Sequence, residues 1–260
     1  MFSNKKTTPF SSEMSKTSRR DYIFARQKEL VLDLVTPLAG ERLLDIGCGD
    51  GSNLQIFRNK WCSLTGVESS REKLETARRT YGDRSEFILA DSTDLPFSDN
   101  EFDIVTIINF LETANDPRKV IEEAIRVCRG RVFIGFLNNY SFFGTRQSLK
   151  ENFGFRLSKK MRFFNYPEIK RMVEDIIGNT IIKWGSVIYF PVIVYDIFEE
   201  LEEIFPIKKN PFGAFVGLTF SVNYTYQTAQ SPITNSFALK ANARDTAPEV
   251  VRDMLRQAQK

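Results

Sequence analysis

The sequence predicts an α/β fold, namely a doubly wound, mostly parallel sheet of seven strands with helices on both faces. Short apolar segments typical of strands alternate along the chain with segments typical of helices. The connections between them are short, which is the pattern of repeated β-α-β units. One segment is almost entirely apolar from Ile104 to Ile108, as expected of a strand that is covered on both faces.

The first element is a helix from Tyr22 to Leu38, because apolar residues recur there at helical spacing among charges. Five strands follow, predicted at residues 42–47, 63–69, 86–91, 102–109 and 131–138. Helices are predicted between them at residues 53–59, at 71–81 with Ser69 or Ser70 as N-cap, and at 116–128, where Asp116-Pro117 is a helix start.

The remaining part of the chain supplies the last two strands. We expect a helix at 167–177, strands at 181–190 and 215–225, and a helix between these strands at 194–204. The predicted domain organisation is a flexible leader (1–20), a single domain (21–228) and a polar tail (229–260) with a short helix after Pro248. Within the domain we distinguish a core (40–138), an insertion (139–165) and the C-terminal strands (179–226).

The composition is that of a soluble globular protein. The 260 residues are 42% hydrophobic and 27% charged, a balance that allows one large domain. No run of about 18 apolar residues occurs, so the sequence predicts no transmembrane helix. The first twenty residues lack an apolar signal-peptide core, which predicts a cytoplasmic protein.

The residue types exclude several kinds of chemistry. The sequence has no histidine, so a serine-hydrolase triad, a zinc hydrolase or a histidine proton relay is a poor hypothesis. Its cysteines, Cys48, Cys62 and Cys128, have no paired spacing, so we predict neither a metal site nor a disulfide framework. The net charge of +3 is too small to indicate nucleic acid by itself.

The most informative motif follows the first strand. Residues 43–51 read LLDIGCGDG, an apolar strand with an acid near its end, then a glycine-rich turn that precedes a helix. Glycines let a backbone approach a ligand closely and adopt positive φ. Ligands of such sheets bind at the carboxyl ends of the strands, so we expect the binding site here.

Two cofactor classes fit such a turn, and charge distinguishes them. A dinucleotide would place its pyrophosphate against Asp45 and Asp50, which repel it. The third glycine also falls one position early for the dinucleotide motif, where Ser52 stands. S-adenosylmethionine (SAM) has no phosphate, and its ammonium and sulfonium groups favour nearby carboxylates. The charge pattern therefore favours SAM.

The next two strands also end in acids. Glu68, at the tip of the second strand, has the position of an acid that accepts both ribose hydroxyls. At the tip of the third, Asp91 or Ser92 can meet the adenine amino group. Each acid alone would more often be a solvated loop residue, but three acidic strand tips in succession favour a nucleoside site.

These motifs resemble class I SAM-dependent methyltransferases, and within them the group of ubiquinone, menaquinone and biotin-pathway methyltransferases. The matching segments are LLDIGCGDG, GVESS and ADSTDLPFSDNEFDIV, all within residues 40–138. The resemblance implies a seven-stranded Rossmann-like sheet whose last strand is antiparallel. It also implies a transferase that methylates its substrate with SAM. The cofactor-binding residues expected from these motifs are Asp45, Gly47, Cys48, Gly49, Glu68, Ser69, Asp91, Ser92, Asn109 and Phe110.

Methyl transfer is an in-line displacement, so holding the acceptor near the methyl group in a dry pocket supplies much of the rate. Many members of the group place a histidine or another catalytic residue after the fourth strand, where this chain has Asn109-Phe110-Leu111-Glu112. Glu112 is the first candidate for a general base, with an exposed acid before a helix as the simpler alternative.

The acceptor is expected to contact the insertion and the C-terminal strands, which are not needed to hold SAM. The insertion is rich in aromatic residues, and Tyr140, Phe143 and Arg146 are the predicted substrate contacts. A lid made of such residues would suit a small, apolar or aromatic acceptor. Alternatively, aromatics such as Phe163, Phe164 and Tyr166 pack as core under a long connection.

Three functions stay open from the sequence. The first is methylation of a small molecule. The second is methylation of RNA or protein, with the basic segment 146–171 as the landing surface; the same segment also fits a peripheral membrane contact or an anionic substrate. The third is a non-catalytic SAM-binding scaffold subunit. The sequence does not predict the oligomeric state.

Overall fold

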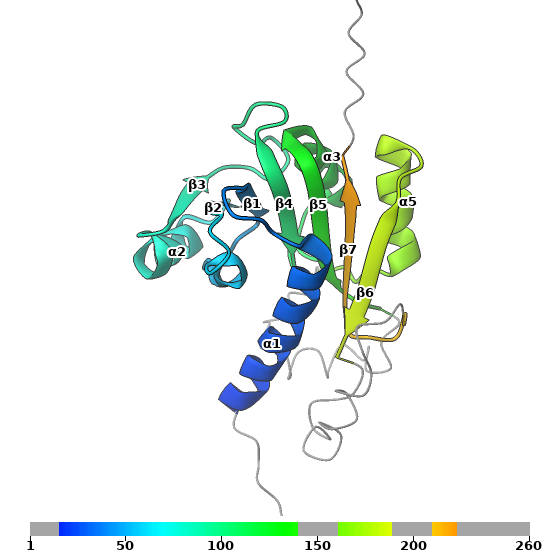
Figure 1. The fold of residues 1–260 in the computed structure, drawn as a ribbon, viewed down its shortest axis with the longest axis horizontal. Coiled ribbons are helices and arrows are strands. Elements are labelled where there is room, and N and C mark those ends of the chain that lie inside the picture. The colour runs from blue at the N-terminus through cyan, green and yellow to red at the C-terminus, as the bar shows by residue number, and fades with distance from the viewer. Residues whose placement is uncertain (1–15, 140–160, 189–209, 223–260) are drawn as a thin grey trace, which may run out of the picture. The chain divides into compact units, whose positions relative to one another are not determined.

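The computed structural model describes residues 16–139, 161–188 and 210–222, and these residues form one seven-stranded sheet in the order β3-β2-β1-β4-β5-β7-β6 (Figure 1). The strands are β1 (Arg42–Ile46), β2 (Ser63–Glu68), β3 (Ser85–Leu89), β4 (Phe102–Ile108), β5 (Cys128–Leu137), β6 (Ile182–Val187) and β7 (Phe215–Ser221).

Six strands point the same way and one is reversed. The first five pair in parallel, whereas β7 is antiparallel to both of its neighbours, β5 and β6. In Figure 1 the arrowhead of β6 points down and that of β7 points up, so the carboxyl ends of the parallel strands lie at the lower edge. The predicted doubly wound, mostly parallel sheet and its antiparallel last strand are confirmed.

Helices cover both faces of the sheet, as predicted. One face carries α3 (Pro117–Val127) and α5 (Tyr166–Ile177), which pack on each other and, through α3, on β4 and β5. The other face carries α1 (Lys16–Val35), the 3₁₀ helix η1 (Ser52–Phe57) and α2 (Arg71–Tyr81). In Figure 1, α1 lies in front of the sheet and α3 behind it.

The strand sequences are apolar on both sides because each side meets a helix layer. Along β1, Leu43 packs with residues of α1, η1 and α2, while Leu44 packs with residues of α3 and α5. Neither leucine is exposed. Alternate residues of a strand point to opposite faces, so a strand between two helix layers needs apolar side chains at successive positions.

Side-chain caps fix the starts of three helices. Ser70 Oγ accepts from Lys73 N at the start of α2, Asp116 Oδ1 accepts from Lys119 N at α3, and Asn165 Oδ1 accepts from Glu168 N at α5. Such caps satisfy backbone N–H groups that the helix leaves without partners. The predicted starts of α2 and α3 are confirmed, with Ser70 as the N-cap of α2.

Three predicted elements are corrected at their ends or in type. Helix α1 begins at Lys16, inside the predicted leader, and it ends at Val35 rather than Leu38 because Pro37 disfavours helical backbone before it. The predicted helix at 53–59 is the 3₁₀ helix η1, with hydrogen bonds such as Leu54 N to Gly51 O three residues apart. Strand β5 begins at Cys128, earlier than predicted.

Other predictions lie outside the described residues. These are the helix at 194–204, most of the leader and the insertion, and the tail after 228. The division into leader, single domain and tail therefore stays a prediction. No helix within the described ranges is both long and apolar enough to cross a membrane, and the cytoplasmic location also stays a prediction.

Candidate functional site

A cleft of about 750 Å³ lies at the carboxyl ends of β2, β3 and β4. Five of the predicted cofactor residues line it: Glu68, Ser69, Asp91, Ser92 and Phe110. They come from three different strand ends, which the parallel sheet brings to the same edge. The volume falls in the range of small-molecule and cofactor pockets.

The glycine turn after β1 adopts backbone conformations that L-residues with side chains rarely enter. Gly47 has φ 73° and Gly49 has φ 59°, both in the left-handed region. The N–H groups of Gly47 and Cys48 both donate to Val67 O, at 2.8 and 3.0 Å. The turn is thus fastened to the end of β2 and keeps its shape beside the cleft.

The two glycines differ in what surrounds them. A Cβ on Gly47 would overlap the ring of Phe110, whereas a Cβ on Gly49 would meet nothing within 4 Å. The open space at Gly49 leaves room for a ligand against the backbone. Cys48, between them, is buried and its side chain packs against Gly66, so only its backbone is available to a cofactor.

Glu68 joins the glycine turn to the start of α2. Its Oε2 accepts from Gly49 N at 3.1 Å and its Oε1 accepts from Ser70 N at 2.9 Å. The residue is 4% exposed and lies on the wall of the cleft. A carboxylate held by two backbone amides has a fixed orientation and keeps lone pairs for hydroxyl donors of a ligand.

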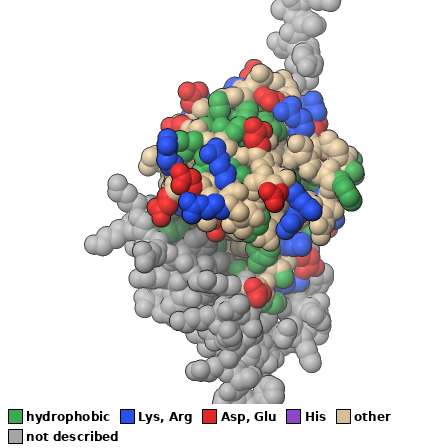
Figure 2. Space-filling view, turned by 90° about the vertical axis from the view of Figure 1, so that its left-hand side faces the viewer, with side chains coloured by type: hydrophobic (Ala, Val, Ile, Leu, Met, Phe, Trp, Pro, Cys, Tyr) green, Lys and Arg blue, Asp and Glu red, His purple; other side chains and the backbone are tan. Residues whose placement is uncertain are grey.

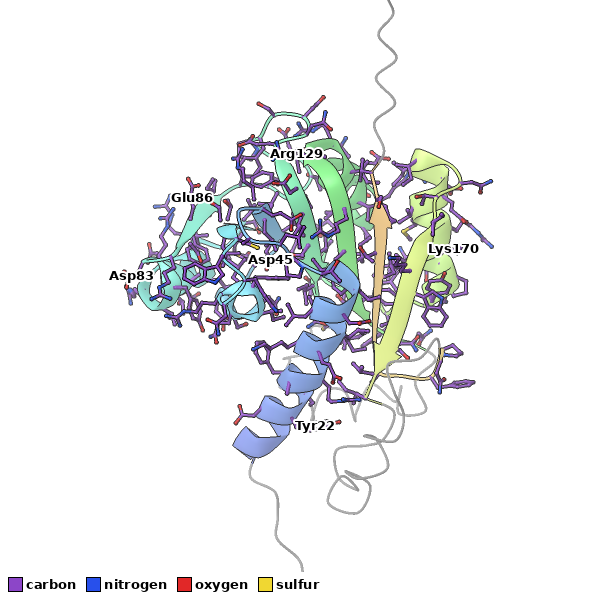
Figure 3. All side chains as sticks on the ribbon, viewed as in Figure 1. Tyr22, Asp45, Asp83, Glu86, Arg129 and Lys170 are labelled. Atoms are coloured by element: carbon purple, nitrogen blue, oxygen red, sulfur yellow. The ribbon has the colours of Figure 1, made fainter. Side chains whose placement is uncertain are left out.

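Asp45 stands near the carboxyl end of β1, just before the glycine turn, and it is fully buried. Thr106 Oγ1, opposite it on β4, donates to Asp45 Oδ1 at 2.7 Å, while Asp45 Oδ2 is buried and has no hydrogen-bond partner among the described residues. Figure 3 shows Asp45 near the centre of the view, away from the edges of the molecule. Burial raises the pKa of Asp45 to about 7, and the nearby charge of Glu68 acts in the same direction.

Asp91 has the opposite environment. It is exposed on the cleft wall, and its Oδ1 accepts from both the N–H and the hydroxyl of Thr93, each at 2.8 Å. These hydrogen bonds lower the pKa of Asp91, so the group is a carboxylate at neutral pH. Ser92 lies beside it on the same wall.

The segment after β4 closes the site toward the glycine turn. Asn109 has a left-handed backbone with φ 54°, and its buried side-chain Oδ1 has no partner among the residues that the structure describes. Backbone strain of this kind in a non-glycine residue clusters at functional sites. The next residue, Phe110, lies against Gly47 and on the cleft wall.

Glu112, the predicted base, is 1% exposed and is absent from the cleft wall. Its Oε1 accepts from Leu137 N at 2.6 Å, and its Oε2 has no partner within residues 16–139, 161–188 and 210–222. The simpler alternative, an exposed acid, is wrong: the left-handed turn at Asn109 directs the following residues into the core.

The predicted acceptor side is described only in part. Tyr140, Phe143 and Arg146 lie outside the described residues. Phe164 is fully buried in the core between α3 and α5, as the alternative reading of the aromatics predicts. Of the basic segment, Arg162 forms an ion pair with Glu168, and Lys170 with Glu174, so these cations are partly neutralised.

Sequence reasoning missed two contributors to the site. Thr106 is the polar residue in an otherwise apolar run and lies opposite Asp45 in the sheet register, which is the signal that could have identified it. Arg126 on α3 donates to Leu95 O, Phe97 O and Asp99 Oδ1, and so fastens the loop after β3. No local pattern of the sequence indicates that contact.

Among the described residues, no group of three or more His, Cys, Asp or Glu side chains could hold a metal ion. The carboxylates also do not fit a pyrophosphate, because Asp45 and Glu68 lie beside the glycine turn. They fit a cationic nucleoside: the unpartnered oxygen of Asp45 suits an ammonium donor, and Glu68 suits a pair of hydroxyls.

The strand order, the reversed β7 and the glycine turn after β1 define the Rossmann-like fold of class I methyltransferases. Residues 44–134 match the family model described as "Methyltransferase domain", which confirms the predicted resemblance to SAM-dependent methyltransferases and agrees with SAM as the predicted cofactor. A solved structure from Thermotoga maritima, a SAM-dependent methyltransferase described as a possible histamine N-methyltransferase, shares the fold. Its TM-score is 0.61 at 22% identity, covering 79% of this chain and 91% of that one.

Two curated relatives have similar sequences. A demethylmenaquinone methyltransferase of Clavibacter sepedonicus is 40% identical over 104 residues, which are 38% of this chain and 42% of the relative. A 27-O-demethylrifamycin SV methyltransferase of Amycolatopsis mediterranei is 38% identical over 105 residues, 37% of this chain and 39% of the relative. The chain thus matches less than half the length of either relative.

Proposed function

We propose that the protein transfers a methyl group from SAM to a small, apolar or aromatic acceptor. The observation that carries the proposal is the set of three acids at successive strand ends around the glycine turn. One of them, Asp45, has a buried oxygen without a partner in the part of the chain that the structure describes. A buried carboxylate without a cation is costly, and a cationic ligand relieves that cost.

The cofactor roles follow from the surroundings of each acid. Glu68, held by two backbone amides, receives the ribose hydroxyls, and Asp91 with Ser92 receives the adenine amino group at the far end of the cleft. Asp45 and the glycine turn receive the amino-acid end, and Asn109 and Phe110 border it. When bound, SAM supplies a methyl group that its sulfonium already activates.

The chain's own residues then need to orient the acceptor and exclude water. Phe110 covers the glycine turn, and Leu111 behind it is fully buried, so the point of transfer is lined by apolar groups. An acceptor atom held there in line with the methyl group gains most of its rate from position and a dry environment. The relatives named for a quinone and for a rifamycin support a small-molecule acceptor.

Methylation of RNA or protein and a non-catalytic scaffold are the alternative outcomes. No observation favours them: two described cations of the basic segment, Arg162 and Lys170, pair with acids. On the face formed by α2 and β3, Lys and Arg side chains alternate with Asp and Glu rather than forming a patch of one sign (Figure 2).

Calorimetric titration with SAM, with its demethylated product and with NAD tests the cofactor. Asp45→Ala and Glu68→Ala should each weaken SAM binding by at least about tenfold, because each removes a charged hydrogen-bond acceptor worth about 1.5–3 kcal/mol. Asp83→Ala is the matched control: this exposed acid after α2 is labelled at the periphery in Figure 3.

Absence of SAM binding, or equal binding by all three variants, would refute the assignment. Turnover is then assayed with labelled SAM and demethylmenaquinone as the first acceptor. SAM binding without transfer to a panel of acceptors would favour the scaffold. Binding of RNA that weakens steeply with salt would favour the RNA alternative.

A further inference from the structure

Glu112 lies where two distant parts of the chain meet. Its side-chain Oε1 accepts from the N–H of Leu137 at 2.6 Å, and its main-chain O accepts from the N–H of Arg162 at 2.9 Å. Leu137 is the last residue of β5, where the chain leaves the sheet, and Arg162 lies a few residues before α5. One residue of the turn after β4 therefore holds both the departing and the returning chain.

Neighbouring hydrogen bonds also join the end of β5 to the segment before α5. Asn139 N donates to Phe164 O at 2.9 Å, so the departing and returning segments also pair directly. Asn138 N donates to Ala214 O at 2.9 Å, and Asn138 Nδ2 donates to Gly213 O at 2.9 Å. The segment that leads into β7 is thus joined to this junction as well.

We propose that Glu112 is a positioning residue, not the general base: by holding Leu137 and Arg162 it fixes the end of β5 and the segment before α5, the two places between which the predicted acceptor contacts lie in the sequence. The inference rests on the proposed methyltransferase function. It explains why an acid stands here although it is 1% exposed and does not line the cleft. A base must reach the proton that it removes directly or through one water.

The surroundings of Glu112 give this role a pH dependence. Burial raises the pKa of Glu112 to about 7, against the opposing hydrogen bond from Leu137. Among the described residues, no charged side chain contributes to the pKa of Glu112. Arg162 donates its backbone N–H to Glu112, but its guanidinium pairs with Glu168 and lies over the Phe164 ring. The carboxyl group's contribution to stability is fully present below pH 4.5 and is lost as the pH rises to about 7.

Hydrogen exchange at single amides is the direct test. In Glu112→Ala, the amide of Leu137 loses its acceptor and should exchange about tenfold faster, whereas Glu112→Gln keeps an acceptor oxygen and should stay within about twofold of the natural protein. Asp103→Asn is the matched control. Its carboxylate accepts a backbone N–H from Arg42 at 3.0 Å at the opposite edge of the sheet, and its loss should not change exchange at Leu137.

Two further measurements separate positioning from catalysis. Thermal unfolding between pH 5 and pH 8 should show a Tm that falls with rising pH in the natural protein and less so in Glu112→Gln. With an acceptor that is turned over, Glu112→Ala should raise the KM for the acceptor and Glu112→Gln should restore it. SAM affinity should stay within about threefold in both variants.

The outcomes are distinct. Unchanged protection of Leu137 in Glu112→Ala overturns the inference, and so does a loss of kcat beyond about a hundredfold in Glu112→Gln, which is the signature of a lost base. If Glu112→Ala does not fold, the pH dependence of the Tm and the kinetics of Glu112→Gln decide between positioning and catalysis. Failure of the natural protein to bind SAM would instead refute the proposed function. The hydrogen-exchange result at Leu137 would not be affected, because it is measured without SAM.

Discussion

Three glycine-to-alanine substitutions separate the stability of the glycine turn from its role in binding. Gly40, Gly47 and Gly49 all have positive φ, but their surroundings differ: a Cβ meets nothing within 4 Å at Gly40 and Gly49 and overlaps Phe110 at Gly47. Gly40 lies before β1 at the opposite edge of the sheet, and Gly49 lies beside Glu68. The three variants therefore separate the effects of backbone strain, of steric overlap and of closeness to the cleft.

The expected magnitudes follow from these surroundings. Left-handed backbone costs an alanine about 1–2 kcal/mol, so Gly40→Ala and Gly49→Ala should lower the free energy of unfolding equally, by about that amount. At roughly 2–4 °C per kcal/mol for a domain of this size, Tm falls by about 2–8 °C. Gly47→Ala adds an overpacking cost of about 1–3 kcal/mol against Phe110, so its loss should be about twice as large.

The SAM affinities of the same variants should follow a different order from their stabilities. Gly49→Ala places a methyl group where the cofactor approaches the backbone, so SAM affinity should fall by more than about tenfold, while Gly40→Ala should bind SAM as the natural protein does. The assays are urea unfolding without ligand and calorimetric titration with SAM. If Gly49→Ala is destabilised like Gly40→Ala but keeps full SAM affinity, the glycine turn is not the point of close approach.

Three further substitutions or conditions test the buried acid of β1. The pKa of Asp45 is raised from 3.8 to about 7. The free energy of unfolding without ligand should therefore fall by about 4 kcal/mol as the pH rises from 3.8 to 7. Asp45→Asn should flatten this pH dependence, which urea unfolding at a series of pH values measures. SAM binding at pH 7 should release protons, because a cation lowers the pKa of Asp45; titrations in buffers of different ionisation enthalpy measure this, and no proton release would contradict it. Thr106→Val removes the hydroxyl donor, so the pKa of Asp45 should rise further and the unfolding free energy at pH 7 should fall by about 1–3 kcal/mol. An unchanged stability of Thr106→Val would show that the hydrogen bond contributes nothing.

Local patterns were sufficient to predict the sheet and the glycine turn. The apolar run of β4 and the turn residues Gly47 and Gly49 each carry their signal within a few neighbouring positions, because strand burial and positive φ are local properties of the chain. The strand-end acids Glu68 and Asp91 could be predicted for the same reason. The parallel order of the strands brings their ends to one edge without any further information.

The contacts between distant segments could not be predicted in this way. The hydrogen bond of Asp45 to Thr106 depends on β1 and β4 being neighbours, and the burial of Glu112 depends on the left-handed turn at Asn109. Neither has a periodic signature. The extension of α1 to Lys16 was missed because a polar segment without apolar spacing still forms a helix when no glycine or proline interrupts it.

The attachment of the loop after β3 has a consequence for how ligands exchange. Arg126 holds Leu95 O, Phe97 O and Asp99 Oδ1 through its guanidinium, and Glu123 holds Leu95 N. Swinging this loop outward would break all of these bonds at once, so it moves together with α3 as a rigid wall. Under the proposed function, we therefore expect SAM and its product to exchange on the other side of the cleft.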